Sequence, residues 1–156
     1  MWLSNDLFRS VVASTPLISI DLIVQNAQGD CLLGQRLNRP AKGDWFVPGG
    51  RILKNETLDA AFRRLTREEL GKERQRQDAR LLGVYEHFYS DSVFGASPEA
   101  PDTHYVVLAY QLVLDQDDVL QPPRAQHDAY RWWALNEMQA SEQVHANTRA
   151  YLDALR

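Results

Sequence analysis

The residues best suited to chemistry lie between positions 49 and 71, where a double glycine, Gly49–Gly50, precedes a helix-like run that ends in the acids Glu68 and Glu69. A glycine allows backbone torsions and a close approach that a Cβ would block. A carboxylate can hold a divalent cation or exchange a proton during a reaction. The role of each acid therefore depends on the helix face that it occupies.

Helical periodicity over residues 57–70 predicts a helix with one apolar face. Its apolar side chains recur at i, i+4 and i+7, namely Leu58, Phe62 and Leu65, with Ala61 at the margin. At about 100° per residue, Glu69 falls in the middle of this stripe, whereas Glu68 lies at its edge, within reach of Arg64. Because an ionised carboxylate that faces a core costs several kcal/mol, an inward Glu69 requires a cation or a protonated state. The alternative is a helix that ends early and leaves Glu69 in solvent.

Capping signals bound this helix. Asn55 or Thr57 can cap its start, and Asp59 complements the positive end of the helix dipole. Gly71 suits the end of the helix. We therefore expect a loop followed by a helix in this segment.

The composition limits the class of protein. The chain has 156 residues, 44% hydrophobic and 24% charged, which is an ordinary globular balance and predicts one domain over residues 1–156. The formal net charge is -4 with no block of Lys and Arg, so no nucleic-acid partner is expected. An anionic small molecule would have to be held by a few placed arginines or by a metal ion.

No apolar run approaches the roughly 18–20 residues that span a bilayer, so no membrane partner is expected. The first residues lack the basic and apolar regions of a signal peptide. The single cysteine, Cys31, excludes an intramolecular disulfide and fits a reducing compartment. These features together predict a cytoplasmic protein.

Two kinds of periodicity interleave along the chain and predict an α/β fold. Alternating apolar residues predict a first strand with one buried face, with Asp21 on its more polar face. The expected strands are 17–26, 31–36, 81–89, 105–114 and 129–134, the expected helices are 5–13, 57–70 and 144–155, and a long loop covers 91–101. Hairpin-like connections beside longer crossovers favour a mixed β-sheet flanked by helices over a fully parallel sheet.

The segment from 50 to 71 resembles the Nudix box, G-x5-E-x7-R-E-U-x-E-E-x-G-U. Six residues stand at the matching positions: Gly50, Glu56, Arg64, Glu68, Glu69 and Gly71. Matches at fixed spacing on a predicted loop and helix make a specific signal. The chain also departs from the box. Leu65 stands where the box has its first glutamate, often a metal ligand or general base, and Lys72 stands where it has an aliphatic residue.

Outside the box, nearly the whole chain is similar to the GDP-mannose mannosyl hydrolases of the Nudix superfamily. The resembling runs are 14–17, 38–41, 45–51, 103–108, 126–128 and 144–147. The resemblance implies a Nudix α/β/α sandwich, a homodimer, a divalent metal and hydrolysis of GDP-mannose to GDP and mannose. It also implies that water substitutes at the anomeric carbon of the sugar with inversion, whereas most Nudix enzymes cleave at phosphorus. GDP-glucose is an alternative substrate.

The resemblance also implies which residues hold the metal, Mg²⁺ or alternatively Mn²⁺. They are the Gly49 carbonyl, the Glu69 carboxylate and the side-chain oxygen of Gln126. Mg²⁺ prefers oxygen ligands and keeps several waters, so a few protein oxygens suffice. Such a metal would supply the cation that an inward Glu69 requires, and it would let GDP depart without a strong general acid.

Because Leu65 replaces the usual base of the box, a base for the attacking water must come from elsewhere. The best candidate is His127, since an imidazole titrates near neutral pH and the residue lies in a polar, turn-like segment. The resemblance gives it this role. Composition alone does not choose among the four histidines, His87, His104, His127 and His145, and the alternative for His127 is a solvated loop residue.

Two further residues complete the catalytic candidates. Arg36 matches a residue that contacts the diphosphate, where a planar guanidinium suits phosphate oxygens. Asp21 matches a carboxylate beside the sugar, where it could stabilise developing positive charge. The plainer interpretations are an arginine at a strand end and a solvent-facing strand residue.

The substrate-binding candidates also come from the resemblance. Besides Arg36, Arg51 and Tyr105 match residues near the phosphates, and Trp2, Leu3 and Phe8 match residues that meet the nucleotide. An aromatic and apolar surface suits a stacked guanine, placed near the dimer interface. The plainer interpretations are an ordinary strand aromatic for Tyr105 and an amphipathic helix docked on the core for the N-terminal residues.

Two other functions stay open on the sequence alone. The first is a standard Nudix pyrophosphohydrolase that yields GMP and a sugar 1-phosphate, for which Glu56 and Glu68 are remaining carboxylates although Leu65 argues against it. The second is a non-catalytic sensor of nucleotide sugars. Retention of Glu69, Gln126 and His127 together argues against a sensor, because binding alone needs no base.

Overall fold

A computed structural model describes residues 2–120, 122 and 127–155, with the backbone alone at 127 and 128. Its α-helices are α1 (Asn5–Ser14), α2 (Leu58–Leu70), α3 (Leu135–Ala140) and α4 (Ala146–Arg149), and its 3-10 helices are η1 (Arg76–Asp78) and η2 (Leu152–Leu155). Its strands are β1 (Leu17–Gln25), β2 (Cys31–Arg36), β3 (Trp45–Phe46), β4 (Gly49–Arg51), β5 (Arg80–Tyr89), β6 (Thr103–Val113) and β7 (His127–Trp133). All five predicted strands are present, and so are the predicted helices at 5–13 and 57–70.

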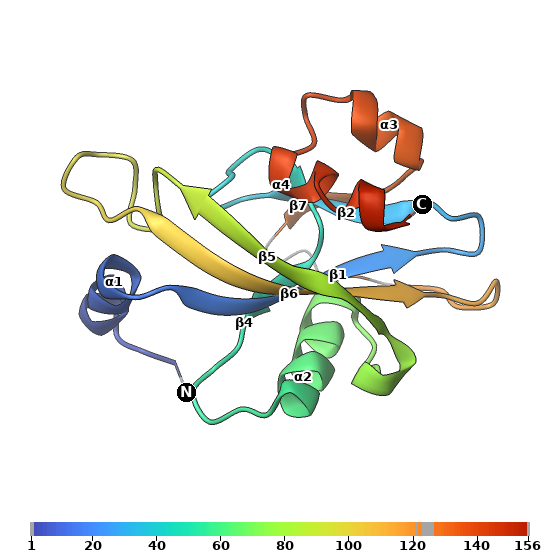
Figure 1. The fold of residues 1–156 in the computed structure, drawn as a ribbon, viewed down its shortest axis with the longest axis horizontal. Coiled ribbons are helices and arrows are strands. Elements are labelled where there is room, and N and C mark those ends of the chain that lie inside the picture. Colours follow the sequence, from blue (N-terminus) through green and yellow to red (C-terminus); the bar gives the residue numbers. More distant parts are fainter. Residues whose placement is uncertain (1, 121, 123–126, 156) are drawn as a thin grey trace.

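The strands form one mixed sheet. Its main path runs β3-β2-β1-β6-β5, with β4 paired to β1 and β7 paired to β2. The long β1–β6 pair is parallel, and the neighbouring pairs are antiparallel. Helix α2 covers one face of the sheet, while α3, α4 and η2 lie over the other (Figure 1). The predicted sandwich with a mixed sheet is confirmed.

Strand β1 is the centre of the fold, and both of its faces are covered. Ile20 and Leu22 pack with α2 in one core cluster, whereas Ile23 belongs to a second cluster on the opposite face. The prediction of a single buried face is therefore wrong, and so is the solvent-facing interpretation of Asp21, which is 7% exposed. The reason is that β1 is an interior strand between two helical layers, a position that alternation along one strand does not reveal.

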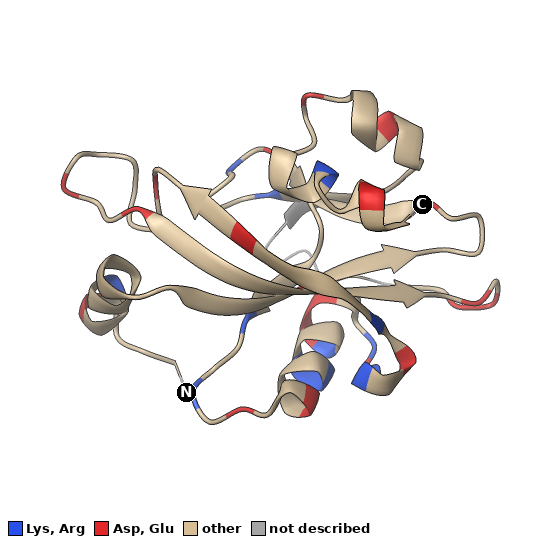
Figure 2. Cartoon of the chain, viewed as in Figure 1, with Lys and Arg blue, Asp and Glu red and all other residues tan. Residues whose placement is uncertain are grey.

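Helix α2 begins and ends as its capping residues predict. The Thr57 hydroxyl accepts a hydrogen bond from the Ala60 amide at 3.1 Å, and Gly71 adopts the left-handed conformation with φ 77°. Asn55 does not cap the helix but lies in the preceding turn with φ 69°. Leu58 is 37% exposed, so the apolar stripe begins one turn later than predicted, while Glu69 is buried at 2%. Acidic and basic residues cover the outer face of α2 (Figure 2).

The C-terminal region differs from its prediction. The helix expected over 144–155 is divided into α4 and η2, and α3 precedes it without having been predicted. The segment docks on the sheet through β3, because the Trp45 amide donates to the Gln143 carbonyl and the His145 amide donates to the Trp45 carbonyl. The long loop at 91–101 is present between β5 and β6, with its Arg39–Asp91 ion pair at 2.9 Å. Among the described residues, no helix is long and apolar enough to span a bilayer.

Gly49 is required for the approach of β4 to β1. A Cβ added there would lie 2.4 Å from the Ile20 carbonyl oxygen and 2.7 Å from Asp21 Oδ1. We predict that Gly49→Ala lowers the free energy of unfolding by about 1–3 kcal/mol, because backbone atoms must move apart. Chemical denaturation followed by circular dichroism measures this loss.

Gly83→Ala provides the matched control. A Cβ at Gly83 would meet only Tyr85, at 3.5 Å, which is an ordinary van der Waals contact. Its effect on stability is expected to stay below about 1 kcal/mol. Equal losses for the two variants would refute the close approach at Gly49.

Candidate active site

A cavity of about 350 Å³ lies where α1, α2 and the sheet meet. Nine of the residues named as candidates from the sequence line it: Trp2, Leu3, Phe8, Asp21, Arg36, Gly49, Arg51, Glu69 and Tyr105. They come from α1 and the residues before it, β1, β2, β4, α2 and β6. Positions far apart in the sequence are therefore brought to one cavity.

Asp21 projects from the centre of β1, opposite Gly49 of β4 in the strand register. Its Oδ2 accepts a hydrogen bond from the Tyr151 hydroxyl at 2.5 Å. Burial raises the pKa of the Asp21 carboxyl to about 7, the Tyr151 hydrogen bond and the Arg36 charge act in the opposite direction, and the Glu69 charge adds to the rise. Asp21 is thus a buried acid at the edge of a cavity, where its charge interacts strongly with nearby groups because little solvent screens it.

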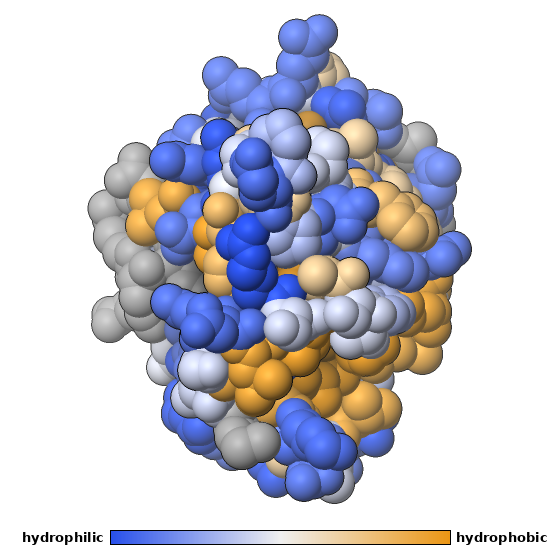
Figure 3. All heavy atoms as spheres, turned by 90° about the vertical axis from the view of Figure 1, so that its left-hand side faces the viewer, coloured by the Kyte–Doolittle hydropathy of each residue, from blue (hydrophilic) through white to orange (hydrophobic). Residues whose placement is uncertain are grey.

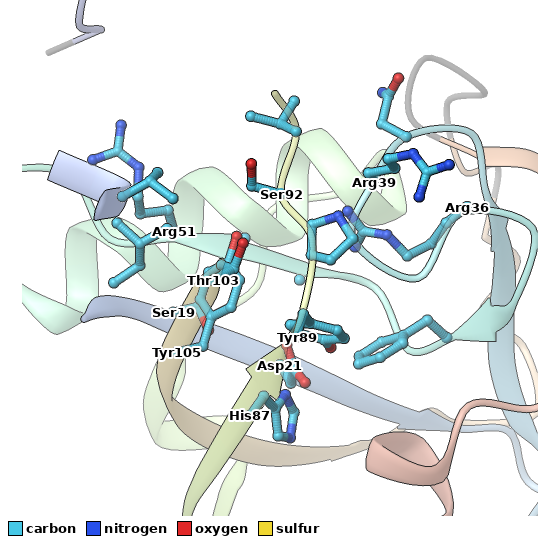
Figure 4. Close-up of a pocket in the computed structure, with 18 of the residues that line it drawn as sticks. Ser19, Asp21, Arg36, Arg39, Arg51, His87, Tyr89, Ser92, Thr103 and Tyr105 are labelled. Carbon is cyan, nitrogen blue, oxygen red and sulfur yellow. The ribbon is translucent and has the colours of Figure 1, made fainter. Parts of the chain in front are cut away.

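Arginines stand on opposite sides of the cavity. Figure 4 shows Arg36 and Arg39 on one side and Arg51 on the other, with Asp21 between them and deeper. The Arg36 guanidinium lies 6.0 Å from the Phe46 ring centroid, and its buried Nε has no hydrogen-bond partner among the described residues. Arg36 therefore retains hydrogen-bonding capacity for an anionic group in the cavity.

A hydrogen-bonded network around Arg64 holds the loop between β4 and α2. Arg64 Nε and Nη2 donate to the two carboxylate oxygens of Glu56 at 2.7 and 2.8 Å, and Nη2 also donates to the Arg51 carbonyl at 2.8 Å. Glu56 accepts the Leu53 amide as well, at 2.8 Å. Hydrogen bonds from Arg64 lower the pKa of Glu56. Both carboxylate oxygens of Glu56 are engaged in this network, which fixes the loop.

Glu68 and Glu69 occupy different environments, as the helical periodicity predicts. Glu69 is 2% exposed, whereas the Glu68 side chain is 40% exposed and forms an ion pair with Arg64 at 3.1 Å. Both line the cavity, together with Gly49 and Gly50. The prediction that Glu69 faces inward is confirmed, and the alternative of an early helix end is wrong.

Oxygen atoms on the side of the cavity formed by β4 and α2 suit a hard divalent cation. They belong to the Glu69 carboxylate and to the backbone of Gly49, both of which line the cavity. Mg²⁺ and Mn²⁺ take such ligands and complete their coordination with water and substrate phosphates. Within the described residues, no group of three or more His, Cys, Asp and Glu is arranged to hold a metal by itself.

Strand β5 contributes His87 and Tyr89, which the sequence did not single out as site residues. Both line the cavity, and they lie two positions apart so that they project from the same face of the strand. Burial lowers the pKa of His87 to about 4 and raises the pKa of the Tyr89 hydroxyl. The only signal in the sequence was the alternation of polar aromatic residues at the end of this strand.

The predicted base, His127, begins strand β7 and pairs in register with Arg36 of β2. The prediction of a turn at this position is therefore wrong, because the backbone of His127 extends the sheet. Its side chain is outside the described part of the structure. Gln126, predicted as a metal ligand, also lies outside the described residues.

The N-terminal candidates border the cavity next to the 91–101 loop. Phe8 packs against Phe94 with ring centroids 5.9 Å apart, and the Arg51 guanidinium lies 4.8 Å from the Phe8 ring centroid. Trp2 is 73% exposed. Hydrophobic residues gather on this face of the molecule (Figure 3). An apolar surface beside arginines and carboxylates suits a ligand with an aromatic part and an anionic part.

Matches to known proteins identify the class of protein that this geometry represents. The NUDIX domain family matches residues 15–155, and the chain therefore belongs to the Nudix family. "Low-salt glycan biosynthesis protein Agl8" of Haloferax volcanii is 38% identical over 152 residues, which are 97% of this chain and 89% of that protein.

Solved structures agree with the family. A MutT NUDIX hydrolase from Burkholderia pseudomallei is 25% identical, covers 92% of this chain and 100% of its own, and has a TM-score of 0.71. A MutT protein from Methanosarcina mazei Go1 is 20% identical, covers 91% of this chain and 94% of its own, and has a TM-score of 0.70. By family and fold, the protein is a Nudix hydrolase.

The Glu56–Arg64 pair generates a prediction about stability. The side chains are 17% and 14% exposed, so Glu56→Gln removes the more buried of the two carboxylates that pair with the Arg64 guanidinium and leaves Glu68 as its charged partner. We expect a loss of about 1–3 kcal/mol in the free energy of unfolding at neutral pH. Because the pKa of Glu56 is lowered in the folded state, its contribution is present above the unfolded pKa and disappears as the pH falls through the folded value.

Denaturant titrations at neutral and acidic pH test this expectation, and the gap between wild type and Glu56→Gln should close on acidification. Glu73→Gln is the control, since Glu73 is 42% exposed and pairs with Arg67 on the surface. Its effect should stay within about 0.5 kcal/mol. A gap that does not change with pH would contradict the electrostatic origin of the stabilisation.

Proposed function

We propose that this Nudix hydrolase acts on GDP-mannose, and by extension on GDP-glucose, and that water attacks the anomeric carbon of the sugar with inversion to release GDP and the free sugar. Nudix hydrolases act with a divalent metal, and we propose Mg²⁺, with Mn²⁺ as an alternative. The proposal rests on the resemblance to the GDP-mannose mannosyl hydrolases and on the chemistry of the cavity walls.

Leu65 is the observation that carries the proposal. It occupies the position of a box glutamate, is 2% exposed and lines the cavity with an apolar side chain. Glu56 is engaged by Arg64 and Leu53, so it does not replace that carboxylate. The box position that would supply a base for attack at phosphorus therefore carries no carboxylate, and this favours attack elsewhere on the substrate.

The leaving group is a nucleoside diphosphate, and its charge must be stabilised as the sugar bond breaks. Arg36 and Arg51 lie on opposite sides of the cavity, where both can donate to phosphate oxygens. Glu69, the Gly49 carbonyl and Gln126 are proposed to hold the metal. When bound, the ion neutralises charge on the diphosphate, so that departure needs no strong acid.

The sugar end of the substrate is proposed to lie toward Asp21. An anomeric carbon acquires positive character when water displaces a good leaving group, and a nearby carboxylate stabilises that charge. His127 is proposed as the base that accepts a proton from the water. Its backbone pairs with Arg36, so these two catalytic candidates start from neighbouring positions in the sheet.

The nucleotide end is proposed to meet Trp2, Leu3 and Phe8, with Tyr105 nearer to the phosphates. Trp2 has the exposed aromatic area on which a base can stack. We also propose a cytoplasmic homodimer, with the N-terminal residues near the interface. The Agl8 relative is named for glycan biosynthesis, and a substrate that carries an activated sugar fits that context.

Hydrolysis of GDP-mannose with Mg²⁺ in ¹⁸O-water tests the bond that is cleaved. We expect the label in mannose and none in phosphate, because water attacks carbon. Early proton NMR spectra should show the anomer of mannose opposite to that of the substrate. Mass spectrometry of both products locates the label.

Other outcomes would overturn the proposal in distinct ways. Label in GMP or mannose 1-phosphate would identify a pyrophosphohydrolase, which the Nudix family also supports. Binding of GDP-mannose without turnover would identify a sensor.

The two adjacent acids of α2 provide a test of the metal site. Glu69→Gln should weaken Mn²⁺ binding, measured by calorimetry in the presence of GDP, by about tenfold to hundredfold, since a buried ligand loses its charge. Glu68→Gln is the matched control, because Glu68 is half in solvent and paired with Arg64. Its effect should be small, and equal effects of the two variants would contradict the proposed ligand.

A further inference from the structure

Tyr151, close to the C-terminus, makes a buried contact with the proposed catalytic carboxylate. The residue lies between α4 and η2 and is 1% exposed. Its hydroxyl is 2.5 Å from Asp21 Oδ2 and 3.3 Å from His87 Nε2. The C-terminal segment thereby reaches a residue on β1 that is separated from it by 130 positions.

The chemistry of these three groups sets the direction of the hydrogen bonds. A phenol has one proton, and the carboxylate of Asp21 accepts it. The Tyr151 oxygen can then only accept from His87, so neutral His87 must carry its proton on Nε2. The resulting chain runs from His87 through Tyr151 to Asp21 with one polarity, and it leaves the second oxygen of Asp21 for the cavity.

Packing leaves the Tyr151 ring little freedom. Its centroid lies 4.7 Å from that of Tyr85 in an edge-on contact and 6.1 Å from that of His87. It belongs to a core cluster that also contains Leu152 and Val144. Thr148, three residues before Tyr151, is fully buried, and its hydroxyl accepts the Val47 amide at 3.4 Å. A rigid side chain of this kind can fix the orientation of the carboxylate that it contacts.

We infer that Tyr151 is a positioning residue of the active site, whose hydroxyl holds the Asp21 carboxylate in the orientation needed beside the sugar. This inference rests on the proposed role of Asp21. A hydroxyl with a merely structural role would stabilise the fold and leave kcat unchanged, whereas a positioning hydroxyl affects the chemical step through Asp21. The C-terminal segment is then a part of the site and not only a cover for the sheet.

A double-mutant cycle on GDP-mannose hydrolysis with Mg²⁺ separates the two roles. Tyr151→Phe keeps the ring and removes the hydroxyl, and we expect kcat to fall by about tenfold to hundredfold with little change in KM. In the Asp21→Asn background, the same substitution should reduce kcat little further, because its effect passes through the lost carboxylate. Thermal unfolding of each variant shows that the assays are made on folded protein.

Tyr110→Phe is the matched control. Tyr110 is 4% exposed, packs against Phe62 in the other core cluster and bonds to Arg76 at 3.3 Å, away from Asp21. It should retain the wild-type kcat. If Tyr151→Phe keeps the wild-type kcat while Asp21→Asn loses activity, the inference is overturned and the proposed role of Asp21 stands. An equal loss in both backgrounds would also overturn it, and wild-type activity of Asp21→Asn would overturn the proposed role of Asp21 together with it.

A measurement on the intact protein gives an independent test. The proton of a short buried hydroxyl–carboxylate bond should appear as an exchange-protected, downfield resonance in the proton NMR spectrum. We expect this resonance in the wild type and its loss or large shift in Asp21→Asn. Its absence from the wild type would overturn the inference even if Tyr151→Phe does not fold.

Discussion

The burial of two carboxylates around one cavity is the constraint on which the site depends. Asp21 and Glu69 are 7% and 2% exposed, and the charge of Glu69 raises the pKa of Asp21. Negative groups in so little solvent must be balanced by cations and hydrogen-bond donors. Arg36 and Tyr151 provide part of this balance at Asp21. A divalent cation held by Glu69 would provide more, and it would allow an acidic cavity to accept the anionic diphosphate that we propose as its ligand.

The rigidity of the segment between β4 and α2 comes from a different set of charges. Arg64 joins Glu56, Glu68 and the Arg51 carbonyl, and Gly49 brings β4 against β1. The box residues therefore have separate tasks. Some bind the loop to its own helix, whereas Glu69 alone among the acids of α2 is buried at the cavity. Leu65 adds an apolar surface to the cavity at the position where the box has a glutamate.

Residues near both ends of the chain contribute to the site together with residues of the sheet. The residues before and within α1 supply an apolar rim next to Arg51 and the 91–101 loop. From the other end, Tyr151 reaches Asp21 beneath the cavity. Strand β1 lies at the centre of the sheet with helices on both faces (Figure 1), and its Asp21 lines the cavity with Phe8 of α1 while it contacts Tyr151 near the other end of the chain. A residue on a central strand can therefore form contacts with several segments that are distant in the sequence.

Local patterns in the sequence were enough to determine helix α2, its caps at Thr57 and Gly71, the β1–β2 hairpin and the inward direction of Glu69. These features depend on periodicity and capping, which act over a few residues. The burial of both faces of β1, the strand conformation at His127 and the contact of Tyr151 with Asp21 were decided only by the tertiary structure. They depend on which segments, distant in sequence, pack against each strand. The alternation of residues within one strand does not indicate which segments these will be.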